Sequence, residues 1–233
     1  MNTHWIQQQH NPGLILFFNG WGMDQHVVRH LKIDPRQDVL MLYDYRSLSV
    51  AEEILSAVSA YSEISVIAWS MGVWAFEQLS PQLQFSNRQA IAINGSGEPV
   101  HEQYGISPSV YQATIDRFSA QGRKKFFVRL CGSRHTFEQF QHCFPQRPLS
   151  EQHEELIAIQ QHSTVHEPRS QTTRIPPPFS HALISTQDRI IPSENQRRYW
   201  ERTTPYSYID APHFPFFLWK SWNAILDYAE QHS

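Results

Sequence analysis

The sequence has few cysteines and no long apolar run. Its two cysteines, Cys131 and Cys143, are twelve residues apart, and neither lies in a closely spaced pair. This spacing indicates neither a disulfide framework nor a metal site, and it suits a reducing compartment such as the cytoplasm. No apolar stretch approaches the ~20 residues that span a bilayer, and residues 1–7 lack the basic and apolar segments of a signal peptide. We therefore expect a cytoplasmic protein that binds neither a metal nor a membrane.

The sequence also lacks a strong excess of charge of either sign. It has 19 Lys and Arg against 22 Asp and Glu, for a net charge of −3, so overall charge does not indicate a nucleic-acid partner. Aromatic residues are abundant, with 7 Trp, 9 Tyr and 14 Phe. They favour a folded protein with apolar pockets. The length of 233 residues fits one α/β domain over residues 1–233, with room for an insertion.

A strand-to-helix turn at Ser70 is the most informative local pattern. Residues 65–69 form a short apolar run that predicts a buried strand, and from Met71 the apolar residues follow helical spacing. Ala68 and Gly72 are small and lie two positions to either side of Ser70. This arrangement is typical of a nucleophile elbow, although its first glycine is replaced by Ala68. A serine at such a position can also be a turn residue alone.

Strands and helices alternate elsewhere, which predicts a mostly parallel sheet with helices on both faces. Further strands are predicted at residues 14–18, 38–45, 89–94, 181–186 and 206–209. Helices are predicted at 24–31, 50–61, 71–81, 193–200 and 217–228, and a linker at 172–178.

The alternation stops between about residues 98 and 167, where only helices are predicted, at 110–119, 123–130, 136–142 and 150–162. Residues 117–147 contain seven Lys and Arg but one acid, Glu138, and phenylalanines lie between the charges. An amphipathic lid accounts for the aromatic residues. The excess of positive charge in this segment favours an acidic partner. A nucleic acid is the alternative partner, but the basic patch is short and interrupts an enzyme-like core.

Three residues that follow predicted strands suggest a catalytic triad. They occur in the order Ser70, Asp188, His213, which is the order of the α/β-hydrolase fold. Residues at the carboxyl ends of parallel strands converge in space. His213 would take the proton of the Ser70 hydroxyl, and Asp188 would orient the imidazole and stabilise its charged form.

The same fold predicts an oxyanion hole. In α/β-hydrolases, one N–H comes from the residue after the nucleophile and the other from a loop after an early strand. These residues are Met71 and Trp21, the latter within Asn19-Gly20-Trp21-Gly22. Alternatively, that loop is an ordinary strand-to-helix turn in which the aromatic side chain only fills space.

Three other residues have some of the features of a triad member. Ser96 lies between two glycines but is not followed directly by a helical pattern, so it reads as a turn residue. Asp44 precedes the position that the chain order requires, and Asp210 is close in sequence to His213.

Five stretches resemble the BioG type of pimeloyl-acyl-carrier-protein methyl ester esterase, and the resemblance covers most of the chain. They are Asn19-Gly20-Trp21-Gly22, Asp44-Tyr45-Arg46, residues 68–74 with the sequence AWSMGVW, Asn94-Gly95-Ser96-Gly97, and residues 126–132. The Gly-Trp-Gly loop and the helical lid are also similar to the BioH type. The segment around His213 matches less closely. The assignment of His213 as the catalytic base therefore depends on its position after a strand as much as on the motif.

The resemblance implies an α/β-hydrolase that cleaves the methyl ester of pimeloyl-acyl carrier protein in biotin synthesis, without a cofactor. It implies a tunnel for the acyl chain and phosphopantetheine arm, lined by Trp21, Trp69, Phe126 and Phe127. The acidic carrier protein would bind the lid through basic residues. The candidates are Arg117, Arg123, Lys124, Lys125 and Arg129. A general carboxylesterase for small esters, a cofactor-free lyase on the same fold and a non-catalytic binding module remain alternatives.

Overall fold

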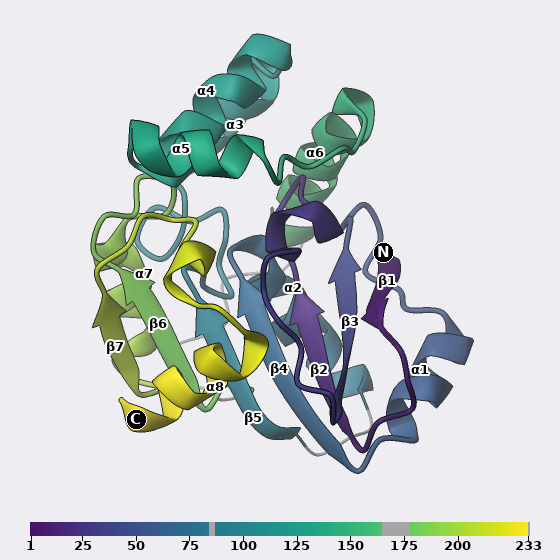
Figure 1. Ribbon diagram of the computed structural model, residues 1–233. Coiled ribbons are helices and arrows are strands. Elements are labelled where there is room, and N and C mark those ends of the chain that lie inside the picture. Colours follow the sequence, from purple (N-terminus) through teal and green to yellow (C-terminus); the bar gives the residue numbers. More distant parts are fainter. Residues whose placement is uncertain (84–86, 165–177, 233) are drawn as a thin grey trace.

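A seven-stranded sheet forms the centre of the computed structural model, which describes residues 1–83, 87–164 and 178–232 (Figure 1). The strands are β1 (Asn2–Gln7), β2 (Gly13–Phe18), β3 (Gln37–Tyr43), β4 (Glu63–Trp69), β5 (Asn87–Ile93), β6 (His181–Ser185) and β7 (Tyr206–Ile209). Their order in the sheet is β1-β3-β2-β4-β5-β6-β7. Only β1 runs antiparallel to its neighbour, so the prediction of a mostly parallel sheet is confirmed.

The central strands are apolar because both faces of the sheet are covered. Every residue of β2 is buried. Leu14, Leu16 and Phe18 pack into one apolar cluster, whereas Ile15 and Phe17 pack into the other. Alternate side chains of one strand therefore serve two cores, one on each face.

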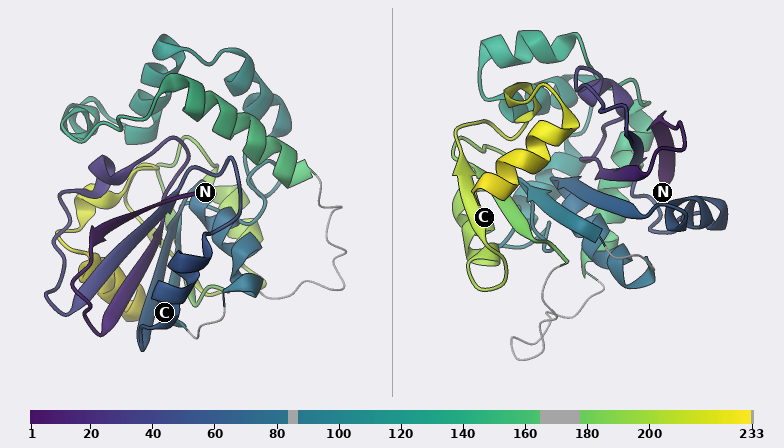
Figure 2. Two further views of the ribbon diagram at one scale, coloured as in Figure 1. Left: turned by 90° about the vertical axis from the view of Figure 1, so that its right-hand side faces the viewer. Right: turned by 60° about the horizontal axis from the view of Figure 1, so that its bottom comes forward.

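Helices cover both faces. The helices α1 (Glu52–Ser59), α2 (Met71–Leu79) and α7 (Ser193–Trp200) contribute buried residues to one cluster. On the other face lie α8 (Trp222–Gln231) and the short 3-10 helix η1 (Gln25–Val28) (Figure 2). Two further 3-10 helices, η2 (Ser80–Gln82) and η3 (Phe216–Leu218), are single turns.

Two predicted helices are wrong in extent. The helix expected at 24–31 is only η1. Its N-cap, Asp24, accepts a hydrogen bond from the His26 N–H with one carboxylate oxygen and from the Gln146 N–H with the other. The helix expected at 217–228 begins instead at Trp222, because the Ser221 hydroxyl caps its first turn by accepting from the Ala224 N–H.

Four helices follow β5 in the segment where the sequence predicts a lid, and we refer to them as the lid. They are α3 (Pro108–Asp116), α4 (Ala120–Cys131), α5 (Arg134–Gln141) and α6 (Leu149–Thr164). They lie above the carboxyl ends of the parallel strands (Figures 1 and 2). The predicted linker at 172–178 lies, apart from its last residue, outside the described residues. Each helix in the described part of the chain is too short or too polar to span a bilayer.

Candidate active site

Ser70 occupies a strained turn between β4 and α2. Its φ of 58° lies in the left-handed region, which costs a non-glycine residue about 1–3 kcal/mol. The Ser70 N–H donates to the Ile93 carbonyl at 2.9 Å, which ties the turn to the neighbouring strand. A Cβ at Gly72 would lie 2.1 Å from the Phe18 carbonyl oxygen, so a residue without a side chain is required there. The sheet therefore holds Ser70 in this conformation.

The three predicted triad residues lie within hydrogen-bond distance of one another. The Ser70 hydroxyl lies 2.9 Å from His213 Nε2, and His213 Nδ1 lies 2.7 Å from Asp188 Oδ2. With Asp188 ionised, Nδ1–H donates to the carboxylate and Nε2 accepts from the serine. The His213 side chain is 1% exposed and the Asp188 side chain 0%. This geometry places an oriented base beside a hydroxyl, the arrangement that nucleophilic catalysis requires.

Further hydrogen bonds hold the Asp188 carboxylate. Its Oδ1 accepts from the N–H groups of Ile190 and Ile191 at 2.8 and 3.0 Å. Its Oδ2 also accepts from Gln196 Nε2 at 2.9 Å, and Gln196 is completely buried in α7. These donors fix the orientation of the carboxylate toward His213.

The backbone of His213 is held from the sheet. Its carbonyl oxygen accepts from Trp69 Nε1 at 2.9 Å and from Asn94 Nδ2 at 3.0 Å. Asn94 Nδ2 also donates to the Ser185 hydroxyl at 2.7 Å. The ends of β4, β5 and β6 thus fix the loop that carries the histidine.

The predicted oxyanion donors lie beside the serine. Trp21 and Met71 line the same cavity as Ser70. Their backbone N–H groups donate to no protein acceptor among residues 1–83, 87–164 and 178–232. A Cβ at Gly20 would lie 2.8 Å from the Trp69 ring, so the loop packs directly on the strand that bears the nucleophile.

The rival residues have other contacts. The Ser96 hydroxyl donates to the Tyr104 carbonyl at 2.7 Å. Asp210 accepts from Thr186 and Gln187. Burial raises the pKa of the Cys131 thiol to about 12, which opposes formation of a nucleophilic thiolate.

An apolar cavity lies between the lid and the strand ends and opens onto Ser70 and His213. Trp21, Trp69 and Phe126 line it, as predicted. Phe127 does not: it is buried behind Phe126 against other aromatic rings of the lid, so its predicted place in the tunnel is wrong. The remaining walls come from the loops after β2, before α3 and after β6, and from α3, α4 and α6. Residues not singled out by the sequence are Met23, Ile106, Val110, Tyr111, Thr114, Leu130, Leu156, Arg189 and Ile190.

Comparison with known proteins identifies the family. A model of the family described as "Pimeloyl-ACP methyl esterase BioG" matches residues 1–225. The chain belongs to the BioG family. Members of this family are carboxylic ester hydrolases.

Individual relatives agree with this assignment. The structure of BioG from Haemophilus influenzae superimposes with a TM-score of 0.85, at 32% identity over 96% of this chain and 99% of that one. An esterase from Exiguobacterium antarcticum, at 12% identity, covers 98% of this chain and 92% of its own, with a TM-score of 0.68, and shows the α/β-hydrolase fold.

A curated relative from Bacteroides fragilis is described as malonyl-[acyl-carrier protein] O-methyltransferase. It is 38% identical over 81% of this chain. The match covers 36% of the relative, so this BioG-family chain spans about a third of that protein's length.

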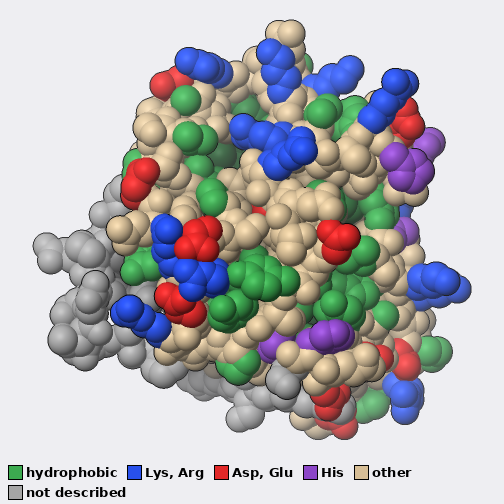
Figure 3. All heavy atoms as spheres, turned by 90° about the vertical axis from the view of Figure 1, so that its left-hand side faces the viewer, with side chains coloured by type: hydrophobic (Ala, Val, Ile, Leu, Met, Phe, Trp, Pro, Cys, Tyr) green, Lys and Arg blue, Asp and Glu red, His purple; other side chains and the backbone are tan. Residues whose placement is uncertain are grey.

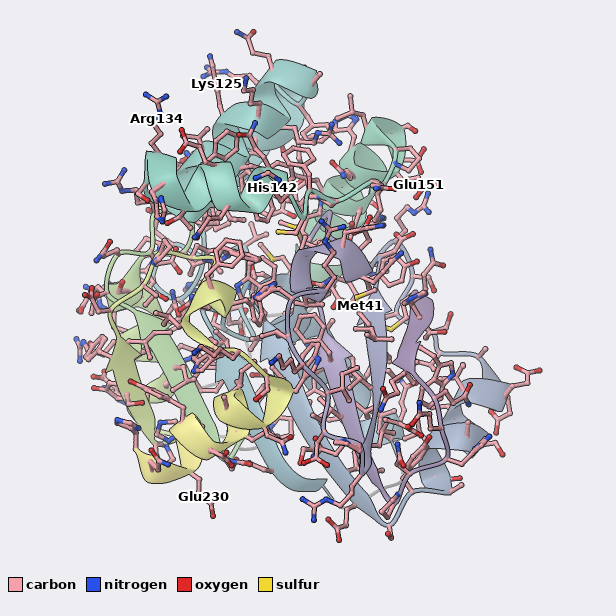
Figure 4. All side chains as sticks on the ribbon, viewed as in Figure 1. Met41, Lys125, Arg134, His142, Glu151 and Glu230 are labelled. Carbon is pink, nitrogen blue, oxygen red and sulfur yellow. The ribbon has the colours of Figure 1, made fainter. Side chains whose placement is uncertain are left out.

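Most of the basic residues predicted to bind a carrier protein are exposed on the lid. Figure 3 shows Lys and Arg side chains gathered at the upper part of one face, and in Figure 4 Lys125 and Arg134 point away from the sheet. The exposed candidates are Arg117, Lys124, Lys125 and Arg129. Arg123 is half-buried, with its guanidinium 5.3 Å from the centre of the Phe144 ring, and burial lowers its pKa.

Two other basic residues of this segment have acidic partners. Arg134 pairs with Glu138 one turn along α5. Arg147 is buried, and it pairs with Asp44 and Glu155 beneath the lid. Arg147 was counted among the basic residues of 117–147, but it does not contribute to the exposed basic surface.

Sequence reasoning missed Gln196, Asn94 and Arg189. Gln196 is one turn into a polar helix, and Asn94 reads as the last residue of a strand. Neither sequence context shows that its side chain reaches the triad. Arg189 directly follows Asp188, and this adjacency was a usable signal that its side chain lies at the cavity.

Proposed function

We propose that this chain hydrolyses the methyl ester of pimeloyl-acyl carrier protein, releasing methanol and a free carboxylate in biotin synthesis. The observation that carries the proposal is the hydrogen-bonded series Ser70–His213–Asp188, which opens onto an apolar cavity under a basic lid. Membership of the BioG family supports an acyl-carrier-bound substrate.

In the proposed reaction, Ser70 Oγ attacks the ester carbonyl carbon while His213 Nε2 takes the hydroxyl proton. The carbonyl oxygen becomes an oxyanion, which the N–H groups of Trp21 and Met71 stabilise. As the tetrahedral intermediate collapses, the bond to the methoxy group breaks and the methoxy oxygen takes the proton from His213. Methanol leaves, and the acyl group remains bound to Ser70.

A water molecule then attacks the acyl group and gives its proton to His213. The second tetrahedral intermediate collapses with return of that proton to Ser70 Oγ, and the carboxylic acid leaves. Asp188 stays ionised throughout and stabilises the imidazolium that forms in each half of the reaction.

The lid provides the proposed carrier contact. The exposed residues Arg117, Lys124, Lys125 and Arg129, with the half-buried Arg123, form a basic surface beside the cavity, and an acyl carrier protein is acidic. Binding the carrier at a site remote from the ester would position the ester against Ser70 and favour it over small esters.

The direct test is hydrolysis of pimeloyl-acyl carrier protein methyl ester by the wild type and by Ser70→Ala. We expect the variant to lose roughly 10³-fold or more in kcat, because the covalent route is removed. Turnover of simple esters without turnover of the carrier-bound ester would favour a general carboxylesterase. Unchanged turnover by the variant would refute the serine mechanism.

A further inference from the structure

One lid helix, α6, holds the loop that carries the Trp21 N–H. Gln152 Nε2 donates to the Gly22 carbonyl at 3.1 Å, and Glu155 Oε2 accepts from the Gly22 N–H at 3.1 Å. The Trp21 indole N–H donates to the Gln152 carbonyl at 2.8 Å. Both backbone groups of Gly22 and the ring of Trp21 are therefore bonded to the same helix.

Gly22 needs such support because glycine has wide conformational freedom. Its φ is +73°, in the left-handed region, and no side chain at this position restricts rotation. The two hydrogen bonds from α6 fix the backbone immediately after Trp21. The orientation of the Trp21 peptide thus depends on the lid as well as on β2.

Glu155 also supports the loop from its other side. Its Oε1 accepts from the Tyr45 N–H at 3.0 Å, and the Tyr45 hydroxyl donates to the Asn19 carbonyl at 2.6 Å. Asn19 precedes Gly20. A single carboxylate is therefore linked to the residues before and after the Gly20-Trp21 peptide.

A buried ion cluster holds this carboxylate in place. Glu155 is completely buried and pairs with Arg147, which pairs in turn with Asp44 at 3.1 Å. Burial raises the pKa of Glu155, and the positive charge of Arg147 opposes that shift. Retaining charged groups in this position is costly unless each is paired, so the geometry of the cluster is tightly constrained.

We propose that Gln152 and Glu155 are positioning residues that hold the Trp21 N–H in its oxyanion-binding orientation. The lid then has a part in the chemical step besides covering the substrate. This inference rests on the proposed function, in which Trp21 supplies one of the two oxyanion donors.

The test compares Gln152→Met and Glu155→Gln with Glu154→Gln. Glu154 lies on the same helix, its side chain is 60% exposed, and it pairs with Arg46, so its variant is a matched control away from the loop. The substrate is p-nitrophenyl butyrate, which requires no carrier protein. Kinetic constants, the inhibition constant of butylboronic acid and the melting temperature are measured for each variant. The boronic acid forms a tetrahedral adduct on Ser70 that resembles the oxyanion intermediate.

For Gln152→Met we expect kcat to fall roughly 10- to 100-fold, less than the loss from removing an oxyanion donor outright. KM should change little, and the boronic acid should bind more weakly by a similar factor, because both report stabilisation of the tetrahedral state. Glu154→Gln should behave as the wild type. Glu155→Gln should show the same signature, and if it fails to fold, Gln152→Met decides the question.

The inference is overturned if Gln152→Met loses no more kcat than the control, or if kcat falls while boronic-acid affinity is unchanged. Ser70→Ala in the same assay separates this failure from that of the proposed function. An inactive Ser70→Ala beside a fully active Gln152→Met would leave the serine mechanism standing and remove only the role of α6.

Discussion

The carboxyl edge of the sheet and the lid above it are held together in different ways. At the sheet edge, backbone hydrogen bonds and buried side chains fix Ser70 and His213. The lid contacts this edge through side chains of α6 and through Leu130, whose carbonyl accepts from the Phe214 N–H next to His213. The exposed surface of α4 is basic. From this difference we propose that the sheet edge carries the catalytic residues and that the exposed basic surface of the lid selects the carrier-bound ester, while the inner face of α6 supports the oxyanion loop.

The largest effect should come from the sheet edge. In Asp188→Asn, the carboxylate that accepts from His213 Nδ1–H is lost, so kcat should fall about 10³- to 10⁴-fold for carrier-bound and small esters alike. Steady-state kinetics on both substrates measure this. Asp210→Asn is the matched control, since Asp210 accepts from Thr186 and Gln187 on a neighbouring surface. Equal losses in the two variants would contradict the assignment of Asp188.

A smaller and more selective effect should come from the lid. Reversing the charge of Arg117, Lys124 and Lys125 together should lower kcat/KM for the carrier-bound ester roughly 10- to 100-fold at low salt, by slowing encounter with an acidic partner. The rate with p-nitrophenyl butyrate should stay the same.

The control is a lid variant that leaves the proposed carrier-binding residues unchanged. Arg134→Ala removes a cation that already pairs with Glu138 and should have little effect on either substrate. If the triple variant slowed both esters equally, the separation of roles between sheet and lid would be lost.

The sheet and the order of the catalytic residues could be predicted because both depend on local patterns. Buried parallel strands are continuous apolar runs, and their ends converge, so Ser70, Asp188 and His213 could be placed together from sequence. The edge strand β1 was missed because its side chains are mostly half-buried and partly polar, which leaves no clear apolar pattern.

The lid was harder to interpret because its contacts join residues that are distant in sequence. Phe126 and Phe127 are adjacent, and which of them faces the cavity depends on how α4 rests on the rings beneath it. Arg147 looks like one more basic residue of the lid until Asp44 and Glu155 are seen beside it. Periodicity gives the faces of a helix but does not identify the partner of each face.

The most direct test of these separate roles is the salt dependence of the wild-type enzyme on two substrates. Between ~20 and ~300 mM salt, kcat/KM for pimeloyl-acyl carrier protein methyl ester should fall at least about tenfold, because screening weakens the encounter of exposed charges. Over the same range, kcat/KM for p-nitrophenyl butyrate should change less than about twofold, since the triad is buried. Parallel curves for the two esters would contradict selection of the carrier-bound ester by the basic lid.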